Sequence, residues 1–412
     1  MSSNQVQNLV VGLDIGTSKV VTVVGQIHDE TGELEIIGIG SQPSKGIKKG
    51  AVINIESTVQ SISKSIEEAE LMSGCRVHSV YVGIAGSHVK SLNSHGIEAI
   101  RDKEVSEADI ERVIEAAQAV AIPSDQKVLH ILPQEFLVDN QDGIREPLGM
   151  SGVRLEAKVH LVTCAVNAYQ NVEKCVKKCG LEVEDIILEQ LASSYSTLTE
   201  DEKDLGVCLI DIGGGTTDVA VFVGGAIRHT AVFAIAGDQV TNDIAVALRT
   251  PTQSAEDIKI KYACAMADLA NDSQTIHVPL VGDRLVQDIS RLKLAEVVEA
   301  RYEEIFSLVQ NELKRSGFED ALAAGIVLTG GSSKMEGVIE LAREIFKVPI
   351  RIGFPQGVSG MNEVIANPVY ATAIGLLLYG CKQRQGGQME SVRREHLKGM
   401  FEKVKNWLKG NF

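Results

Sequence analysis

Apolar residues in the first 85 positions form short runs, interrupted by one long amphipathic segment. Apolar residues recur every three or four positions from Ile55 to Ser73, which predicts a helix. Short runs rich in Val, Ile and Leu predict strands over 9–13, 19–26, 34–40 and 77–84. Strands that alternate with helices are typical of an α/β domain.

A different pattern interrupts this domain over residues 86–162. A helix is expected over 107–119, strands near 128–138 and 158–162, and a charged loop over 139–152. The α/β pattern resumes afterwards, with a helix over 168–179 and a strand over 183–188. We therefore expect residues 86–162 to be an inserted α+β subdomain.

A second α/β half begins near residue 205, which agrees with a chain of 412 residues being too long for one core. Two apolar runs, 207–210 and 219–223, flank a glycine-rich turn. Helices are then expected over 239–248, 292–315, 338–346 and 370–379, with a strand over 348–352.

The glycine-rich turn between the two runs has features of an anion site. Three glycines leave room for close approach of a ligand, and their N–H groups can point into one concave nest. Two threonines add hydroxyl donors, and Asp211 can hold a divalent cation through water. The residues concerned are Asp211, Gly213, Gly214, Gly215, Thr216 and Thr217.

The same build occurs near the beginning of the chain, where a strand leads through Asp14, Gly16, Thr17, Ser18 and Lys19 into a second strand. Either turn alone could be a tight hairpin without a ligand. Two such hairpins, about 200 residues apart, indicate an internal duplication in which both halves face one nucleotide.

Composition excludes several classes of protein. The formal net charge of −15 argues against a general nucleic-acid binder. The seven cysteines lack C-x-x-C spacing and the nine histidines lack ligand spacing, so we expect free thiols rather than a metal cluster. The polar first residues do not predict a signal peptide, and the apolar runs are too short for a membrane-spanning helix.

With the strand that ends in Gly330, Gly331 and Ser332, the two hairpins resemble the nucleotide motifs of the actin, sugar-kinase and chaperone superfamily. The whole chain from about residue 8 resembles the FtsA family of bacterial cell-division proteins. The segments that carry this resemblance are 10–19, 160–163, 191–196, 206–218 and 367–376. It implies an actin-like, ribonuclease-H-like duplicated fold with ATP and Mg²⁺ between the halves, the cation being held through water by Asp14 and Asp211.

The resemblance also implies a division of the chain into named subdomains. These are IA (1–85 and 163–204), the inserted IC (86–162), IIA (205–228 and 305–381), IIB (229–304), a flexible linker (382–391) and an amphipathic membrane-targeting helix (392–412). Subdomain IC is either a structural insertion or, as the family implies, a contact surface for neighbouring subunits and later division proteins.

Further nucleotide contacts follow from the same resemblance. Gly237 and Asp238 are expected near the nucleotide, with Asp238 as a possible helix cap. Glu256 and Lys259 share a helix face, as an exposed ion pair or, in the superfamily, as a wall for adenine and ribose. Glu189 is a candidate general base for a water molecule, or else a helix cap.

Two cationic regions stand out in this acidic chain. Arg284, Arg291, Lys293 and Arg301 are either a solvated helix face or, as the resemblance implies, a site for the acidic C-terminal peptide of FtsZ. The last 20 residues contain six basic and two acidic residues, a net charge of +4, which leaves −19 for the rest.

The apolar residues of this last segment recur at helical spacing, which predicts an amphipathic helix on an anionic membrane surface. The alternative is a helix that docks on protein. The residues expected to meet lipid are Leu397, Lys398, Met400, Phe401, Val404, Lys405, Trp407, Leu408 and Phe412.

The sequence patterns alone predict a two-domain nucleotide binder with a tail for a membrane surface. The resemblance implies an ATP-binding, actin-like protein that self-assembles on the cytoplasmic face of the bacterial inner membrane and anchors FtsZ filaments there. On this interpretation ATP is mainly a conformational ligand, with at most slow hydrolysis. A small-molecule kinase of the same superfamily is the alternative.

Overall fold

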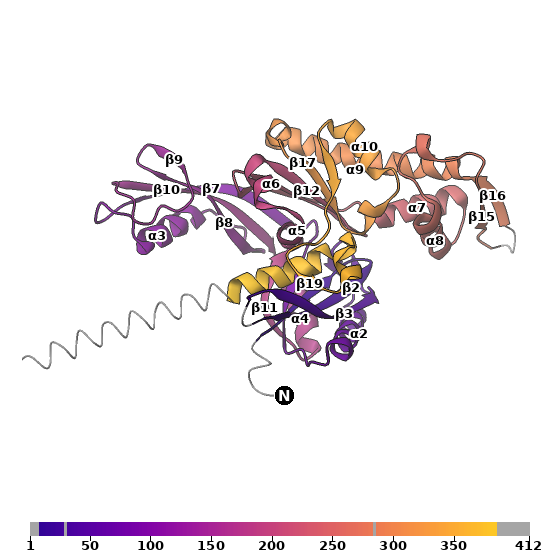
Figure 1. Cartoon of the computed structure of the whole chain (residues 1–412), viewed down its shortest axis with the longest axis horizontal. Coiled ribbons are helices and arrows are strands. Elements are labelled where there is room, and N and C mark those ends of the chain that lie inside the picture. Colours follow the sequence, from indigo (N-terminus) through magenta and orange to yellow (C-terminus); the bar gives the residue numbers. More distant parts are fainter. Residues whose placement is uncertain (1–7, 29–30, 283–285, 385–412) are drawn as a thin grey trace, which may run out of the picture.

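Two α/β halves with a smaller sheet inserted into the first make up the protein (Figure 1). The structure is a computed structural model that describes residues 8–28, 31–282 and 286–384. The expected membrane-targeting helix and most of the linker before it lie outside these ranges. Within them, no helix combines the length and apolar character needed to cross a bilayer.

The first half is built on a six-stranded sheet with the order β11-β6-β1-β2-β3-β19. The strands β1, β2 and β3 pair in antiparallel fashion, whereas β6 and β11 add in parallel beyond β1. The bounds are β1 (Leu9–Ile15), β2 (Lys19–Ile27), β3 (Leu34–Pro43), β6 (Ser79–Ile84), β11 (Glu182–Leu188) and β19 (Ser359–Gly360). A small hairpin, β4 (Ile47–Lys48) and β5 (Ala51–Val52), follows β3.

Helices cover both faces of this sheet because apolar side chains alternate between the faces. Val11 and Leu13 of β1 pack with α2 (Ile55–Ser73) and α4 (Val166–Lys178). Helix α2 begins where the Asn54 side chain accepts a hydrogen bond from the Ser57 N–H, and it ends at a left-handed glycine, Gly74.

The second half repeats this topology. Its sheet has the order β14-β13-β12-β17-β18, with an antiparallel hairpin, a third antiparallel strand and two parallel strands. The bounds are β12 (Val207–Ile212), β13 (Thr217–Val223), β14 (Ala226–Phe233), β17 (Gly325–Thr329) and β18 (Ile350–Ile352). The internal duplication predicted from the two hairpins is therefore present at the level of whole sheets.

The outer face of the second sheet packs on α7 (Gly237–Leu248), α9 (Arg291–Ser316) and α10 (Val338–Phe346). Smaller elements complete this half and its connections. They are α6 (Glu200–Leu205), α8 (Thr252–Tyr262), η1 (Ala267–Leu269), β15 (Thr275–Pro279), β16 (Val286–Ser290), η2 (Glu319–Ala321), η3 (Gly331–Lys334), α11 (Asn362–Ile365) and η4 (Pro368–Tyr370).

Two helices lie between the sheets and share one core with both halves. They are α5 (Glu189–Thr197) and the helix over residues 371–384, which Figure 1 shows in yellow between the halves. A Cβ atom on Gly375 would lie 1.9 Å from the Ala192 carbonyl oxygen, so these helices touch backbone to backbone. We expected 305–381 to stay with the second half, but from β19 onward this segment also packs against the first sheet.

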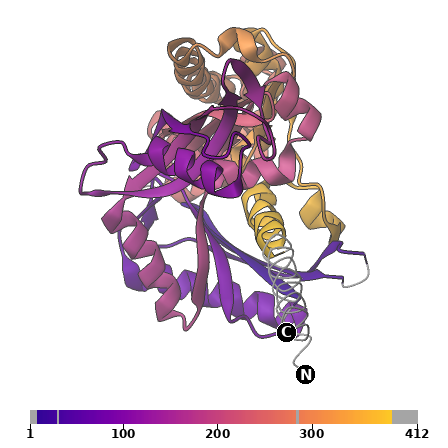
Figure 2. The same ribbon diagram turned by 90° about the vertical axis from the view of Figure 1, so that its left-hand side faces the viewer.

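The inserted subdomain is a four-stranded sheet, β7-β10-β8-β9, with helix α3 (Glu107–Gln118) against it. Its strands are β7 (Val89–Ala99), β8 (Gln126–Val138), β9 (Gln141–Ile144) and β10 (Arg154–Ala165). The sequence did not predict β7, whose residues are mostly polar and at least partly exposed, and it placed β9 in a loop. Figures 1 and 2 show this subdomain beside the second half of the chain.

Polar contacts join the inserted sheet to β14 of the second half. The Gln134 side chain donates to the Ile227 carbonyl oxygen at 2.9 Å, and the Ser91 hydroxyl donates to the Thr230 carbonyl oxygen at 3.1 Å. The buried His160 lies between Asn93 and Thr230, with its two ring nitrogens 2.6 Å and 3.0 Å from their side-chain oxygens. We call this set of contacts the seam; it connects a subdomain of the first half to the second half.

Candidate functional site

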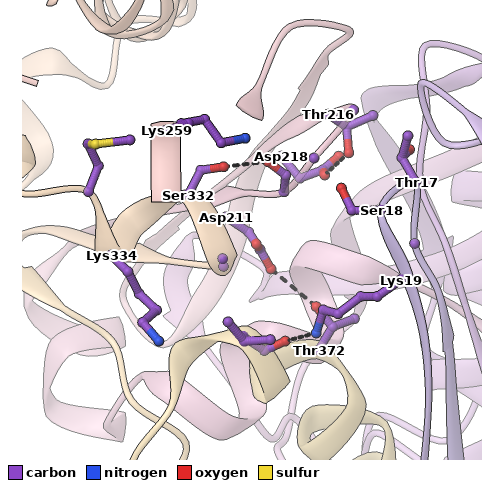
Figure 3. A pocket seen from close by; sticks show the side chains of 18 of the residues that line it. Thr17, Ser18, Lys19, Asp211, Thr216, Asp218, Lys259, Ser332, Lys334 and Thr372 are labelled. Atoms are coloured by element: carbon purple, nitrogen blue, oxygen red, sulfur yellow. Dashed lines mark hydrogen bonds between the residues drawn. The ribbon is translucent and has the colours of Figure 1, made fainter. Parts of the chain in front are cut away.

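A cavity of about 700 Å³ lies between the two halves, at the ends of β1 and β12. Both glycine-rich turns line it, together with the start of α5, helix α8, the segment after β17 and the start of the helix over 371–384. Figure 3 shows side chains from these separate segments pointing into one space. We call this cavity the cleft.

The two turns are tight hairpins with the same register. In the first, Ile15 pairs with Val20, and in the second, Ile212 pairs with Thr217. The Gly213 N–H donates to the Thr216 carbonyl oxygen at 2.9 Å, which closes the second turn.

The tips of the two turns touch each other across the cleft. A Cβ atom on Gly214 would lie 1.7 Å from the Ser18 hydroxyl oxygen, and one on Gly215 would lie 2.4 Å from that of Thr17. A side chain at either glycine would therefore force the opposing Ser18 or Thr17 side chain out of its position. The glycines thus permit close approach of the two turns as well as of a ligand.

Four carboxylates from different elements gather at this end of the cleft: Asp14, Glu189, Asp211 and Asp218. Burial, opposed by Lys19 and aided by Asp211, raises the pKa of Asp14 to about 6. Burial and the charge of Asp211 raise the pKa of Asp218 to about 8. Burial and the neighbouring acids raise the pKa of Glu189 well above its usual value. Several carboxylates this close together are unfavourable when ionised, and a bound cation would relieve their mutual repulsion.

Lys19 is the ammonium group next to these acids. It donates to the Val369 carbonyl oxygen and lies 4.9 Å from the centre of the Tyr370 ring. Burial lowers the pKa of Lys19, although Asp14 acts in the opposite direction.

The other end of the cleft is formed by α8, α9 and the turn after β17. The Lys259 ammonium pairs with Glu256 at 2.7 Å and donates to the Gly237 carbonyl oxygen at 3.1 Å. The Ser332 hydroxyl donates to the Gly213 carbonyl oxygen, and the Tyr302 hydroxyl donates to that of Ser332, both at 2.8 Å. Glu256 and Lys259 thus form an ion pair and also line the cleft.

The structure brings most of the predicted nucleotide residues together. Those that line the cleft are Asp14, Gly16, Thr17, Ser18, Lys19, Glu189, Asp211, Gly213, Gly214, Gly215, Thr216, Glu256, Lys259, Gly330, Gly331 and Ser332. Three predicted residues are next to the lining but not part of it. The Thr217 hydroxyl donates to the Ile235 carbonyl oxygen, and the N–H groups of Gly237 and Asp238 donate to the carbonyl oxygens of Gly213 and Gly214.

Two expected helix caps are wrong. Helix α7 begins at Gly237 and its N-cap is Ala236, so Asp238 lies within the first turn. Likewise Glu189 is the first residue of α5, whose N-cap is Leu188 and carries no side-chain hydrogen bond. Both acids are thus placed where a helix N-terminus favours negative charge.

The sequence interpretation missed several lining residues, among them Asp218, Tyr302, Lys334 and Thr372. Asp218 was detectable, because it follows the two threonines of the turn and pairs with Asp211 across the hairpin. Thr372 was not, because nothing local in the sequence brings it to a strand that is 161 residues away.

The expected cationic cluster for a partner peptide is largely neutralised within the chain. Arg291 pairs with Glu336 at 2.5 Å, and Arg301 pairs with Asp243 at 2.5 Å. Lys293 is exposed, and Arg284 lies outside the described residues, as do the lipid-facing residues expected in the tail.

The acidic end of the cleft fits a hydrated divalent cation. The described residues contain no cluster of three or more His, Cys, Asp or Glu side chains arranged for direct coordination. However, Oδ1 of Asp218 is buried without a hydrogen-bond partner, although its Oδ2 accepts a 2.8 Å bond from Thr216. An unpaired buried carboxylate oxygen is costly, and water molecules on Mg²⁺ would satisfy it.

Solved structures define the class of protein. The chain resembles a structure described as the PilM-PilN type IV pilus biogenesis complex, with a TM-score of 0.67 and 18% identity over 90% of this chain and 98% of that one. It also resembles MreB5 of Spiroplasma citri bound to AMPPNP, with a TM-score of 0.58 and 15% identity over 93% of this chain and 99% of that one. The fold is therefore the duplicated, actin-like α/β fold, as the two hairpins predicted.

Sequence relatives define the family within this class. The profile described as "Cell division protein FtsA" matches residues 208–375, and "SHS2 domain inserted in FTSA" matches residues 86–163. The cell division protein FtsA of Pseudomonas aeruginosa is 64% identical over all of both chains, and that of Escherichia coli K12 is 43% identical over 98% of this chain and 99% of its own. The chain belongs to the FtsA family of cell-division proteins.

Proposed function

We propose that this cell-division protein binds ATP with Mg²⁺ in the cleft, assembles into filaments on the cytoplasmic face of the bacterial inner membrane and anchors FtsZ filaments there. The observation that carries the nucleotide part is the meeting of two glycine-rich turns, one from each half, above four carboxylates, of which Asp14, Asp211 and Asp218 are buried. The FtsA family membership supports the cell-division part.

Each end of the cleft suits one part of ATP. The N–H groups and hydroxyls of the turns, with the Lys19 ammonium, would bind the phosphates. These groups are hydrogen-bond donors, and the glycines carry no side chain that would keep a phosphate away from them. Asp14, Asp211 and Asp218 would hold Mg²⁺ through its water molecules, and the cation would neutralise charge between them and the phosphates. Lys259, Tyr302 and Ser332 would line the nucleoside end.

ATP would act mainly as a conformational ligand. Its phosphates would be held by both halves at once, so binding favours the closed arrangement of the cleft. Glu189 remains the candidate general base, since it lines the cleft at the first residue of α5. In this proposal hydrolysis is slow and is not required for closure.

The remaining contacts are proposed from the sequence and the family. The basic amphipathic tail would bind anionic lipid, the inserted subdomain would contact neighbouring subunits and later division proteins, and the start of α9 would bind the acidic peptide of FtsZ. Lys293 is exposed and would be accessible to such a peptide. At Arg291 and Arg301, the peptide carboxylates would have to compete with Glu336 and Asp243.

Co-sedimentation with vesicles tests the proposal. FtsZ should sediment with anionic vesicles when this chain and MgATP are present, and should stay in solution with the variant Trp407→Glu. No sedimentation with anionic vesicles would contradict membrane anchoring, and equal sedimentation with neutral vesicles would contradict binding through the basic residues of the tail. Rapid ATP turnover with a common sugar would instead favour the kinase alternative.

A further inference from the structure

We propose that the Ser193 and Thr372 hydroxyls are positioning residues for Asp211, which they fix in one orientation so that its second oxygen takes the hydrated cation of MgATP. This inference rests on the proposed nucleotide site and adds a specific pair of residues to it. Neither hydroxyl is required to touch ATP or the cation.

The geometry is a closed triangle of oxygen atoms. The Ser193 hydroxyl donates to Oδ2 of Asp211 at 2.6 Å, and the Thr372 hydroxyl lies 3.2 Å from the same oxygen. The two hydroxyl oxygens are 3.0 Å apart. Thr372 can thus give its proton to the carboxylate or to Ser193, and in both cases the chain of donors ends on Oδ2.

The three residues come from three segments that are distant in the sequence. Asp211 ends β12, Ser193 lies in α5, and Thr372 lies at the start of the helix over 371–384. All three are buried, with Ser193 fully inaccessible. A buried carboxylate that accepts hydrogen bonds from two hydroxyls has few orientations open to it.

The free oxygen of Asp211 is on the side of the cleft. Oδ1 lies beside Gly330, where a Cβ atom would approach it to 2.3 Å, and Gly330 lines the cleft. Since Oδ2 is engaged by Ser193 and Thr372, Oδ1 is the oxygen left for a cation-bound water molecule. Hydrogen bonds behind metal-binding carboxylates have this effect in general.

The two hydroxyls also work against burial. Burial raises the pKa of Asp211, whereas the hydrogen bonds from Ser193 and Thr372 lower it.

A purely structural role does not account for this arrangement. Helix α5 and the helix over 371–384 are already joined by the Ser196 hydroxyl, which donates to the Ala371 carbonyl oxygen at 2.7 Å, and by the contact at Gly375. Ser196 therefore provides a matched control. Like Ser193, it is a buried serine of α5 whose hydroxyl contacts the helix over 371–384, but it does not bond to Asp211.

The test uses the full chain and a fluorescent ATP analogue, titrated at several Mg²⁺ concentrations and in EDTA. The variants Ser193→Ala and Thr372→Val should raise the Mg²⁺ concentration needed for tight binding about tenfold or more, with little change in EDTA. The conservative Thr372→Ser should behave like the unmodified chain. Ser196→Ala should change thermal stability without changing the Mg²⁺ dependence.

The outcomes separate the two levels of the proposal. If the unmodified chain shows no Mg²⁺-dependent binding, the nucleotide site itself is wrong. If it does, but both hydroxyl-free variants keep its Mg²⁺ dependence, the positioning role is overturned. Thermal unfolding without nucleotide reports whether each variant folds; should Thr372→Val not fold, Ser193→Ala, which adds no volume, decides the question.

Discussion

The ring of His160, on a strand of the inserted subdomain, lies 3.0 Å from the Thr230 hydroxyl oxygen, on a strand of the second half. Its other ring nitrogen lies 2.6 Å from the Asn93 amide oxygen, which accepts and so places the ring proton on Nδ1. In the neutral ring Nε2 accepts from the Thr230 hydroxyl, whereas a second proton would make Nε2 a donor, reverse the direction of this bond and place a charge in a buried site.

This relationship predicts a pH dependence of stability. Burial, with His229 nearby, lowers the pKa of His160 from 6.5 to about 4, and His229 in turn pairs with Glu312. The contribution of His160 to the free energy of unfolding is present above pH 6.5 and is lost as the pH falls from there through about 4, because the unfolded chain takes up the proton first. The loss is on the order of 3 kcal/mol.

Thermal unfolding between pH 7 and pH 4 checks this contribution. The variant His160→Gln should be less stable at pH 7 but lose less stability on acidification than the unmodified chain. The comparison between variants is needed because His130, Asp14 and Asp218 also titrate with shifted pKa values. An exposed control, His28→Gln, should follow the unmodified profile.

The contact between the turn tips predicts coupled effects of substitutions there. Gly214→Ala should weaken MgATP binding, because its Cβ would lie 1.7 Å from the Ser18 hydroxyl oxygen and would displace that hydroxyl. Ser18→Ala should restore part of the loss, a coupling that a double-mutant cycle measures. Gly331→Ala, whose Cβ would meet Val369 at 3.7 Å and not Ser18, is the control for this coupling: Ser18→Ala should not restore any loss that it causes. Independent, additive effects would contradict contact between the tips.

The carboxylate cluster predicts opposite effects on stability with and without ligand. Asp218→Asn should stabilise the chain in EDTA, since it removes a buried acid from beside Asp211. The same substitution should reduce the stabilisation that MgATP provides, as measured by the shift in Tm. The exposed Asp272→Asn should do neither. A variant that is destabilised in both conditions would indicate a structural role for Asp218.

Packing of the last described helix predicts a large cost at one glycine. Gly375→Ala should lower the free energy of unfolding by about 1–3 kcal/mol, because its Cβ would overlap the Ala192 carbonyl. Gly74→Ala meets no atom within 4 Å and should cost about 1 kcal/mol through its positive φ alone. Denaturant titration separates the two; equal costs would mean that the helices separate easily.

The cationic residues of α9 predict two kinds of variant. Lys293→Glu should weaken binding of an acidic FtsZ peptide without loss of stability, because the side chain is exposed. Arg301→Ala should mainly destabilise the fold, because it leaves Asp243 unpaired. Titration of the peptide at low and high salt, with thermal unfolding in parallel, checks both. If Lys293→Gln and Lys293→Glu weaken peptide binding equally, the loss comes from a missing contact and not from charge repulsion.

Local sequence patterns predicted most elements because their stabilising contacts follow a simple period. Helix α2 begins and ends at the predicted residues, and both phosphate-type hairpins are present. Strand β7 was missed because it alternates polar residues and gains its stability from β10 and α3, and Thr372 was missed because its partners Ser193 and Asp211 are distant in sequence. The ion pairs of Arg291 and Arg301 could likewise not be read from their charge alone.

The segment from β19 through the helix over 371–384 also limits when the first half can be completed. Lys19 bonds to a residue 350 positions later, and β3 pairs with β19 from the same late segment. During synthesis, one apolar face of the first sheet therefore lacks its covering helix until residues 371–384 have left the ribosome. The cleft therefore depends on this late segment as well: a chain truncated before η4 would lack Val369 and Thr372, which line it.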